Sequence, residues 1–405
     1  MYSITLKGLR ELVSNFSGGR GAFYTMHRPR IDHALFLWKR ELPTVTPYYA
    51  VKCNPEPQFL KTLFDRGIRF DCASERELKE VACLGPSMES RIVYANPCKS
   101  GRDLVAAKAM GSPLTVVDSV EEIAKLGGYR GGTLVRIAVD DSGSAMPFSS
   151  KFGCTREEVT RIGEAAAAAG VDVHGVSFHV GSGCTEGVAY ERAIEAAYRC
   201  VELLRGVRGS NRGESIVDIG GGFLPVMSDF EQKAASIRAA MRGIGDSSIR
   251  WIAEPGRFLA ANSFQFFVQV IGKKAGSKDT WHYTIDDSLY GQFTCILFDQ
   301  ARPHWVRIPM SDEAPRRFTS GTVFGRTCDS VDVIARASVM EELEVGDWLW
   351  FPNMGAYTRA TASEFNGFPS PPVFAVDDAL EGAERAMQMP SGIRRVQPIS
   401  AASVW

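Results

Sequence analysis

Short apolar runs rich in β-branched and aromatic residues recur along the first two thirds of the chain. Most are apolar at successive positions rather than alternating with polar residues, which is typical of strands in a parallel sheet covered on both faces. The runs predict eight strands, at residues 48–52, 68–72, 91–95, 114–118, 133–139, 175–180, 215–219 and 250–254.

Helix-like stretches separate the predicted strands. Three of them begin with a capping box, in which Ser or Thr is followed three residues later by Glu: Ser74 with Glu77, Ser119 with Glu122, and Thr155 with Glu158. The third predicts a helix that ends at Gly170. Eight strands alternating with helices indicate an α/β fold, a parallel (β/α)8 TIM-like barrel. An open doubly wound sheet alternates in the same way, but no GxGxxG follows the first strand, which favours the barrel.

After about Phe258 the pattern changes to closely spaced β-like runs separated by turns, at residues 264–271, 282–287 and 347–352. This pattern predicts a second, antiparallel β domain, a sandwich or a barrel-like sheet. We therefore predict a barrel domain at 27–260 and a β domain formed by 261–405 with a contribution from 1–26. The tail from Ala383 onward has little periodicity and predicts little regular structure.

Charge and cysteine usage narrow the class of protein. Lys and Arg number 46 and Asp and Glu 47, so no broad field favours nucleic acid or a membrane surface, and a small molecule is the expected partner. The nine cysteines are spread singly, which suits reduced thiols rather than disulfides or a metal site. No run approaches the roughly 20 apolar residues of a membrane helix, and the N-terminus lacks a signal-peptide core, so we expect a cytoplasmic enzyme.

The predicted barrel brings a set of reactive residues to one mouth, because active sites of such barrels lie at the carboxyl ends of the strands. The residues at or just after those ends are Lys52, Asp71, Arg136, His179, Gly220, Gly221, Gly222, Glu254 and Arg257.

Taken singly, each candidate also has a purely structural interpretation. Lys52 is a surface lysine or a partly desolvated amine that forms a Schiff base. The three glycines make a tight turn or, together with Ser182 and Arg257, a phosphate site. Glu254 ends a strand or keeps a pyridine nitrogen of a cofactor protonated, and His179 is a core residue or a ring stacked on that cofactor.

Two residues of the predicted β domain have similarly open interpretations. Cys328 is a buried small hydrophobe or a catalytic thiol. Asp299 is a solvated or capping aspartate, or a substrate ligand. Spacing alone does not decide between them.

The motifs together resemble those of the eukaryotic-type ornithine decarboxylases, within the alanine-racemase-like fold-type III group of pyridoxal-phosphate enzymes. The resemblance covers nearly the whole chain, and the matching motifs occur in the order of that family. They are YYAVKCN, FDCAS, VRIAVDDS, KFG, VSFHVGSG, DIGGGF, AEPGR, YGQFTCILFD, FGRTCDSVD, NMGAYT and FNGF.

The resemblance implies pyridoxal 5'-phosphate as cofactor and a role for each matching residue. Lys52 would carry the cofactor as a Schiff base, His179 would stack on its ring and Glu254 would pair with its nitrogen. Asp71 and Arg136 match positions near the cofactor. The phosphate ligands would be Ser182, Gly220, Gly221, Gly222, Arg257 and Tyr357.

The same resemblance implies decarboxylation of L-ornithine to putrescine, a step of polyamine biosynthesis, by a homodimer with shared active sites. Cys328 of the other subunit would protonate the α-carbon after carbon dioxide leaves. Asp299, and Asp329 of the other subunit, would receive the terminal ammonium, with Phe298 and Phe365 also on the substrate side. Lys151 and Asp332 resemble an intersubunit ion pair.

Several positions depart from the family pattern and leave the substrate open. Ser288 replaces the glycine of an Asn-Asp-Gly motif, Leu224 stands between Phe and Pro, Phe298 replaces a common Tyr, and Gln300 a frequent His. The alternatives are a decarboxylase of lysine, arginine, diaminopimelate or an acidic amino acid on the same fold, a racemase, or a non-enzymatic homologue like the antizyme inhibitors. HVGSG and CDS differ from the HxGSQ and CES usual in diaminopimelate decarboxylases.

Overall fold

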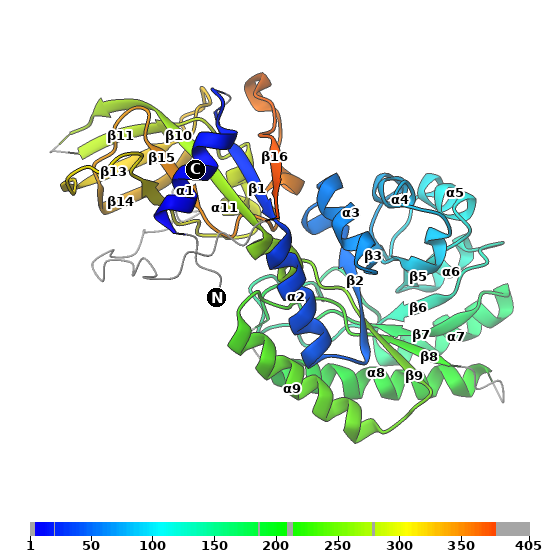
Figure 1. Cartoon of the computed structure of the whole chain (residues 1–405). Coiled ribbons are helices and arrows are strands. Elements are labelled where there is room, and N and C mark those ends of the chain that lie inside the picture. Colours follow the sequence, from blue (N-terminus) through cyan, green and yellow to red (C-terminus); the bar gives the residue numbers. More distant parts are fainter. Residues whose placement is uncertain (1–4, 20, 185–186, 209–213, 278–279, 378–405) are drawn as a thin grey trace. The chain divides into compact units, whose positions relative to one another are not determined.

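A computed structural model describes residues 5–377, apart from residues 20, 185–186, 209–213 and 278–279, so the tail from Ala383 lies outside the described residues. The chain divides into two compact units (Figure 1). The barrel unit is His33–Leu259, and the β unit combines Met1–Asp32 with Ala260–Trp405. Within the described part, no helix combines the length and the apolar character that crossing a membrane requires.

Eight parallel strands close into a barrel, which confirms the predicted (β/α)8 fold. The ring closes where Val45 of the first strand pairs with Trp251 of the last. Buried side chains fill its interior, including Tyr48, Val116 and Ile252. The strands are β2 (Val45–Ala50), β3 (Arg69–Cys72), β4 (Ile92–Tyr94), β5 (Leu114–Val117), β6 (Thr133–Arg136), β7 (Val173–Ser177), β8 (Ser215–Asp218) and β9 (Ile249–Ala253).

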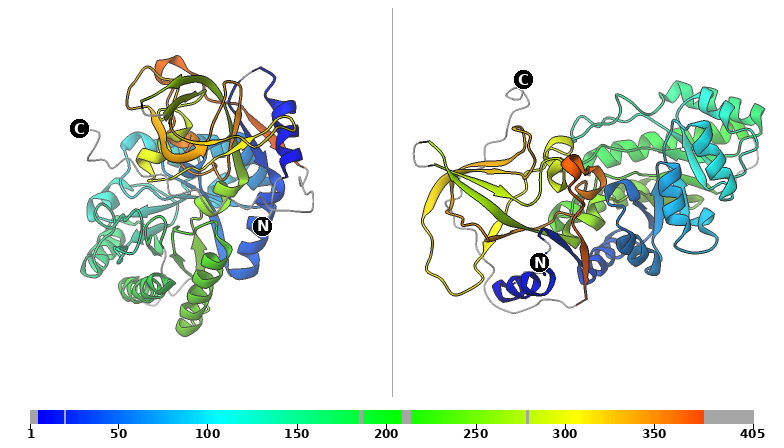
Figure 2. Two further views of the ribbon diagram at one scale, coloured as in Figure 1. Left: turned by 90° about the vertical axis from the view of Figure 1, so that its left-hand side faces the viewer. Right: turned by 90° about the horizontal axis from the view of Figure 1, so that it is seen from above.

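Helices follow the strands and lie outside the ring (Figure 2). They are α3 (Pro57–Asp65), α4 (Glu75–Ala82), α5 (Gly101–Ala109), α6 (Val120–Lys125), α7 (Arg156–Ala169), α8 (Gly187–Arg208) and α9 (Met227–Ile244), with α2 (Arg28–Glu41) leading into the barrel and α10 (Arg257–Ala260) leaving it. One-turn 3-10 helices occur at Val51–Cys53 and Met88–Arg91.

The predicted helix caps are confirmed on the serine or threonine side. Ser74, Ser119 and Thr155 each accept the backbone N–H three residues later, and Gly170 ends α7 with a φ of 66°. Only Thr155 with Glu158 forms the full reciprocal box. For the other two boxes, the predicted contact from the glutamate back to the N-cap N–H was wrong. The Glu77 carboxylate accepts the N–H of Ala73 instead, and the Glu122 carboxylate accepts the N–H of Lys99.

Strand ends differ from prediction by a few residues, and these differences matter for the site. β2 stops at Ala50, and Lys52 lies in the following 3-10 turn rather than at a strand end, because the N–H of Asn54 donates to the carbonyl of Val51 (3.1 Å). β6 ends at Arg136, and His179 lies two residues beyond β7. Lys52 and His179 thus lie just beyond the strands, whereas Arg136 is the last residue of its strand.

The β unit contains an eight-stranded sheet within the described residues. Most neighbours are antiparallel, as predicted, but β1 with β16 and β11 with β13 pair in parallel. The strands are β1 (Phe23–His27), β10 (Phe264–Ala275), β11 (Thr280–Ile285), β12 (Val306–Ile308), β13 (Phe318–Phe324), β14 (Val333–Glu341), β15 (Trp348–Phe351) and β16 (Val373–Val376).

The first helix completes the core of the β unit. α1 (Leu6–Phe16) buries Leu9, Leu12 and Val13 against Phe23 and Trp348. The remaining short helices are α11 (Cys295–Phe298) and 3-10 turns at Ala261–Ser263, Gln292–Thr294, Arg359–Thr361 and Phe365–Gly367.

Candidate active site

Lys52 and Asp71 form an ion pair at the mouth of the barrel. Lys52 Nζ lies 2.9 Å from Asp71 Oδ2, and the lysine side chain keeps 44% of its surface exposed, whereas that of Asp71 keeps 1%. The other carboxylate oxygen, Asp71 Oδ1, has no hydrogen-bond partner within the described residues. The amine is therefore held in place by a buried charge while remaining accessible.

Two further acids face this pair. Burial raises the pKa of Glu254 well above its usual value, and the charges of Asp218 and Asp71 raise it further. Burial also raises the pKa of Asp218, to about 6. Asp218 accepts the N–H of Gly220 (2.9 Å) through Oδ1, and its Oδ2 is buried with no partner in the described part of the chain. The mouth thus holds more buried carboxyl groups than the charges of Lys52 and Arg136 can keep ionised.

His179 carries a neutral ring. Its Nδ1 accepts the N–H of Gly181 (2.9 Å), and burial, with the positive charges of Arg136 and Lys52, lowers its pKa well below 6.5. Phe148 packs edge-on against the ring, with centroids 4.9 Å apart. These contacts fix the ring plane, which a stacking residue requires.

The three glycines after β8 have no room for a side chain. Gly220 and Gly222 have φ of 64° and 103°, in the left-handed region. A Cβ on Gly221 would lie 2.8 Å from the carbonyl oxygen of Glu254 and 2.9 Å from His179 Nε2. The backbone therefore passes very close to the ring of His179.

Ser182 and Arg257 complete the barrel set. Arg257 Nη2 donates to Ser182 Oγ (3.2 Å), although the two residues are 75 positions apart in sequence. A guanidinium, a hydroxyl and a glycine-rich turn are the groups that bind a phosphate.

A second group of candidates lies in the β unit, on its surface. Asp329 accepts the hydroxyl of Tyr290 (2.5 Å), which lowers the carboxyl pKa. Tyr290 in turn stacks on Phe365, with centroids 4.3 Å apart. The N–H of Cys328 donates to Asn366 Oδ1 (3.1 Å), and the cysteine side chain is exposed. Tyr290, Phe365 and Asn366 therefore hold the segment that presents Cys328 and Asp329.

The other candidates of the β unit lie in turns or at the end of the short helix α11. Phe298 is 64% exposed at the end of α11, and Asp299 follows it. Tyr357 has a φ of 56°, a strained conformation for a residue with a side chain. Asp332 is buried and accepts from the N–H of Leu289 (2.7 Å) and from Thr327 in its own chain, so its pairing with Lys151 of another subunit stays a prediction.

Comparison with known proteins identifies the family. The model of the pyridoxal-binding domain of pyridoxal-dependent decarboxylases matches residues 28–261. An ornithine decarboxylase of Nicotiana glauca, named as chloroplastic, is 39% identical over 357 residues, covering 85% of this chain and 81% of that protein. The chain belongs to the pyridoxal-dependent decarboxylases.

Other members of the family agree in sequence and fold. The ornithine decarboxylase of Mus pahari is 39% identical over 385 residues, covering 89% of this chain and 81% of that protein. The arginine decarboxylase of Paramecium bursaria Chlorella virus superposes with a TM-score of 0.86 at 31% identity, covering 92% of this chain and all of the viral one. The lysine/ornithine decarboxylase of Vibrio vulnificus superposes with a TM-score of 0.83 at 31% identity, covering 93% of this chain and 100% of that protein.

Pyridoxal 5'-phosphate is the cofactor of this decarboxylase, and the residues at the barrel mouth fit it. Its protonated pyridine nitrogen would supply the positive charge that Glu254 and Asp218 lack. The left-handed glycine turn at Gly220–Gly222 offers backbone N–H groups without side chains, which suits a phosphate. The accessible amine of Lys52 suits an aldehyde, and Ser182 with Arg257 suits a phosphate.

Sequence reasoning missed Asp218 and Tyr290. Asp218 occupies the apolar run SIVDI, and a charged residue inside a buried strand was the available signal. Tyr290 contacts Asp329 across 39 residues of sequence, so no local pattern could reveal it. Ser288, a departure from the family pattern, is accommodated because its hydroxyl accepts the N–H of Gly291 (2.8 Å).

Proposed function

We propose that this decarboxylase converts L-ornithine to putrescine. The main support is the position of the Asp329 carboxylate, which Tyr290 holds beside the exposed Cys328. This carboxylate offers an anion to the distal ammonium of the substrate. The two ornithine decarboxylases at 39% identity support this choice of substrate.

The barrel residues bind and polarise the cofactor in this proposal. Lys52 attaches it covalently, His179 lies against its ring, and Ser182, Arg257, Gly220–Gly222 and Tyr357 hold its phosphate. When bound, pyridoxal phosphate supplies an electron sink for the pair released from the α-carbon. Glu254 keeps the ring nitrogen protonated, and Asp71 with Arg136 positions Lys52 and the neighbouring charges.

Two residues of the β unit, Cys328 and Asp329, act on the substrate from a second protomer. Cys328 delivers a proton to the α-carbon after carbon dioxide leaves, and Asp329 receives the terminal ammonium. Asp299, Phe298 and Phe365 complete the substrate side. The exposure of Cys328, Phe298 and Phe365 on the single chain supports a homodimer in which another chain covers them. The nine free cysteines support the cytoplasm as its compartment.

Lysine or arginine is the second candidate substrate. Phe298 and Gln300 replace a common Tyr and a frequent His, and the solved relatives include an arginine decarboxylase and a lysine/ornithine decarboxylase. Lysine is longer than ornithine by one methylene, which a pocket discriminates by about 10- to 200-fold.

The test is carbon dioxide release from L-ornithine, L-lysine, L-arginine, their D-forms and meso-diaminopimelate by the protein with added pyridoxal phosphate. We expect the highest kcat/KM for L-ornithine, and a raised KM in Asp329→Asn. Asp312→Asn is the matched control, because its side chain is 98% exposed and contacts Arg10. Preference for another substrate would overturn the ornithine assignment and leave the decarboxylase intact.

A further inference from the structure

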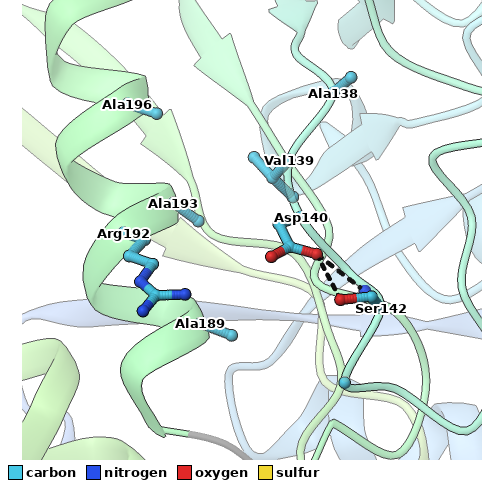
Figure 3. Close-up of a pocket in the computed structure, with 9 residues that line it drawn as sticks. Ala138, Val139, Asp140, Ser142, Ala189, Arg192, Ala193 and Ala196 are labelled. Carbon is cyan, nitrogen blue, oxygen red and sulfur yellow. Dashed lines mark hydrogen bonds between the residues drawn. The ribbon is translucent and has the colours of Figure 1, made fainter.

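A surface cavity of about 450 Å³ opens in the barrel unit, between the segment after β6 and helix α8 (Figure 3). This volume lies within the range of about 300–1,000 Å³ typical of small-molecule sites. Small apolar side chains form most of its lining, among them Ala138, Val139, Ala189 and Ala193. None of the cofactor-site candidates lines it.

Two opposite charges face each other across this cavity. Arg192 extends from α8, and Asp140 lies on the facing segment (Figure 3). Asp140 Oδ1 accepts both the N–H (3.1 Å) and the hydroxyl (2.6 Å) of Ser142, which fixes the carboxylate. These hydrogen bonds lower the pKa of Asp140, and the charge of Arg192 lowers it further, so the carboxylate is ionised.

The two charges do not neutralise each other directly. Within the described residues, Arg192 has no hydrogen bond and no ion pair, and Asp140 Oδ2 has no partner. A ligand that spans them needs an anionic and a cationic group on a small apolar body. A diamine has no anionic group for Arg192, and a simple carboxylic acid has no cationic group for Asp140.

The segment that forms one wall of the cavity also contacts the candidate cofactor residues His179 and Ser182. The segment from Asp140 to Phe148 carries Met146, which exchanges backbone hydrogen bonds with Ser182 in both directions (3.1 and 3.0 Å). Ser144 donates its hydroxyl to the carbonyl of Val180, and Phe148 packs on the ring of His179. A ligand that orders residues 140–143 therefore also restrains the residues that contact His179 and Ser182.

We propose that this cavity is a second small-molecule site, which takes an L-α-amino acid with a short aliphatic side chain. Arg192 binds the carboxylate, Asp140 binds the ammonium, and the alanines and Val139 contact the side chain. Its occupant tightens the 140–148 segment against the cofactor site. The amino acid bound here need not be the substrate of the decarboxylase.

Calorimetric titration of the cofactor-loaded enzyme tests the ligand class. The probes are L-norvaline, which carries both charges, pentanoate, which lacks the ammonium, and butylamine, which lacks the carboxylate. We expect saturable norvaline binding at this site and at least tenfold weaker binding of the other two, because each loses one charge-assisted hydrogen-bonded contact.

Three variants assign the binding to the cavity. Arg192→Gln should weaken norvaline at least tenfold and weaken pentanoate as well. Asp140→Asn keeps the acceptor for Ser142 but removes the charge, so it should weaken norvaline and leave pentanoate unchanged. Arg199→Gln, on the same helix and paired with Glu195 on the surface (3.2 Å), is the matched control and should change neither.

Amide hydrogen exchange tests the coupling to the cofactor side. Norvaline should slow exchange at Met146 and Ser182 in the wild type and in Arg199→Gln, but not in Arg192→Gln. Absence of saturable binding, or equal binding and protection in Arg192→Gln, would overturn the proposal. None of these readouts depends on which amino acid the enzyme decarboxylates.

Discussion

The barrel unit and the β unit carry their candidate residues in different ways. In the barrel, Lys52 is paired with Asp71, Ser182 with Arg257, and His179 with the backbone of Gly181. In the β unit, Cys328 and Phe298 are exposed, and Tyr290 and Asn366 hold the segment that carries Cys328 and Asp329.

This difference indicates a division of labour between the two units. The barrel candidates contact one another or the nearby backbone within one chain, through an ion pair and hydrogen bonds. The β-unit candidates Cys328 and Phe298 are uncovered in the single chain, which fits the proposal that they meet a partner and a substrate. Variants of each unit should therefore fail in different ways.

The largest effect is expected for Lys52→Ala. Removal of the amine should abolish the visible absorbance band of the bound cofactor and reduce decarboxylation to background. Lys61→Ala, whose side chain is exposed and paired with Asp65, should retain both. A visible band that survives in Lys52→Ala would contradict the covalent attachment.

The next effect concerns the pH dependence of stability in the cofactor-free protein. The folded-state pKa of Asp218, about 6, lies above its usual 3.8, so this group stabilises the fold below about pH 4, and the contribution is lost as the pH rises through 6. Two pKa units correspond to on the order of 2–3 kcal/mol. Asp218→Asn should therefore gain about that much over wild type between pH 4 and pH 7.5.

Urea unfolding of the cofactor-free protein at several pH values measures this gain. Asp65→Asn, in an exposed pair with Lys61, should show no comparable change with pH. The gain should be smaller in the cofactor-loaded protein, because the pyridinium charge favours ionised carboxylates nearby. If the difference in unfolding free energy between Asp218→Asn and wild type did not change with pH, the raised pKa of Asp218 would be contradicted.

The smallest effect is expected for Tyr290→Phe in the β unit. Loss of one hydrogen bond to a carboxylate costs about 1–2 kcal/mol, which predicts a roughly 5- to 30-fold higher KM for L-ornithine. The cofactor band should be unchanged, because Tyr290 acts through Asp329, within the β unit. Tyr198→Phe in α8 is a control for the loss of a hydroxyl, and equal KM values in the two variants would exclude the positioning role.

The sequence allowed the barrel to be predicted well, because its strands are continuous apolar runs and its site residues lie at or just after the carboxyl ends of those strands. The turn that carries Lys52 was not predictable, since the 3-10 bond from Asn54 to Val51 competes locally with one more strand residue. The parallel pairs β1 with β16 and β11 with β13 join segments far apart in sequence, which periodicity does not reveal. Contacts such as Tyr290 with Asp329 were hidden for the same reason.

Mixing two inactive variants tests the proposed shared site most directly. Lys52→Ala and Cys328→Ala homodimers should each form little putrescine, the second losing about 10²- to 10⁴-fold as expected for a missing proton donor. After the subunits exchange at random, half of the dimers are mixed and each has one intact site, so about a quarter of wild-type putrescine formation should return. No recovery after exchange would contradict the account and place both residues of a site on one chain.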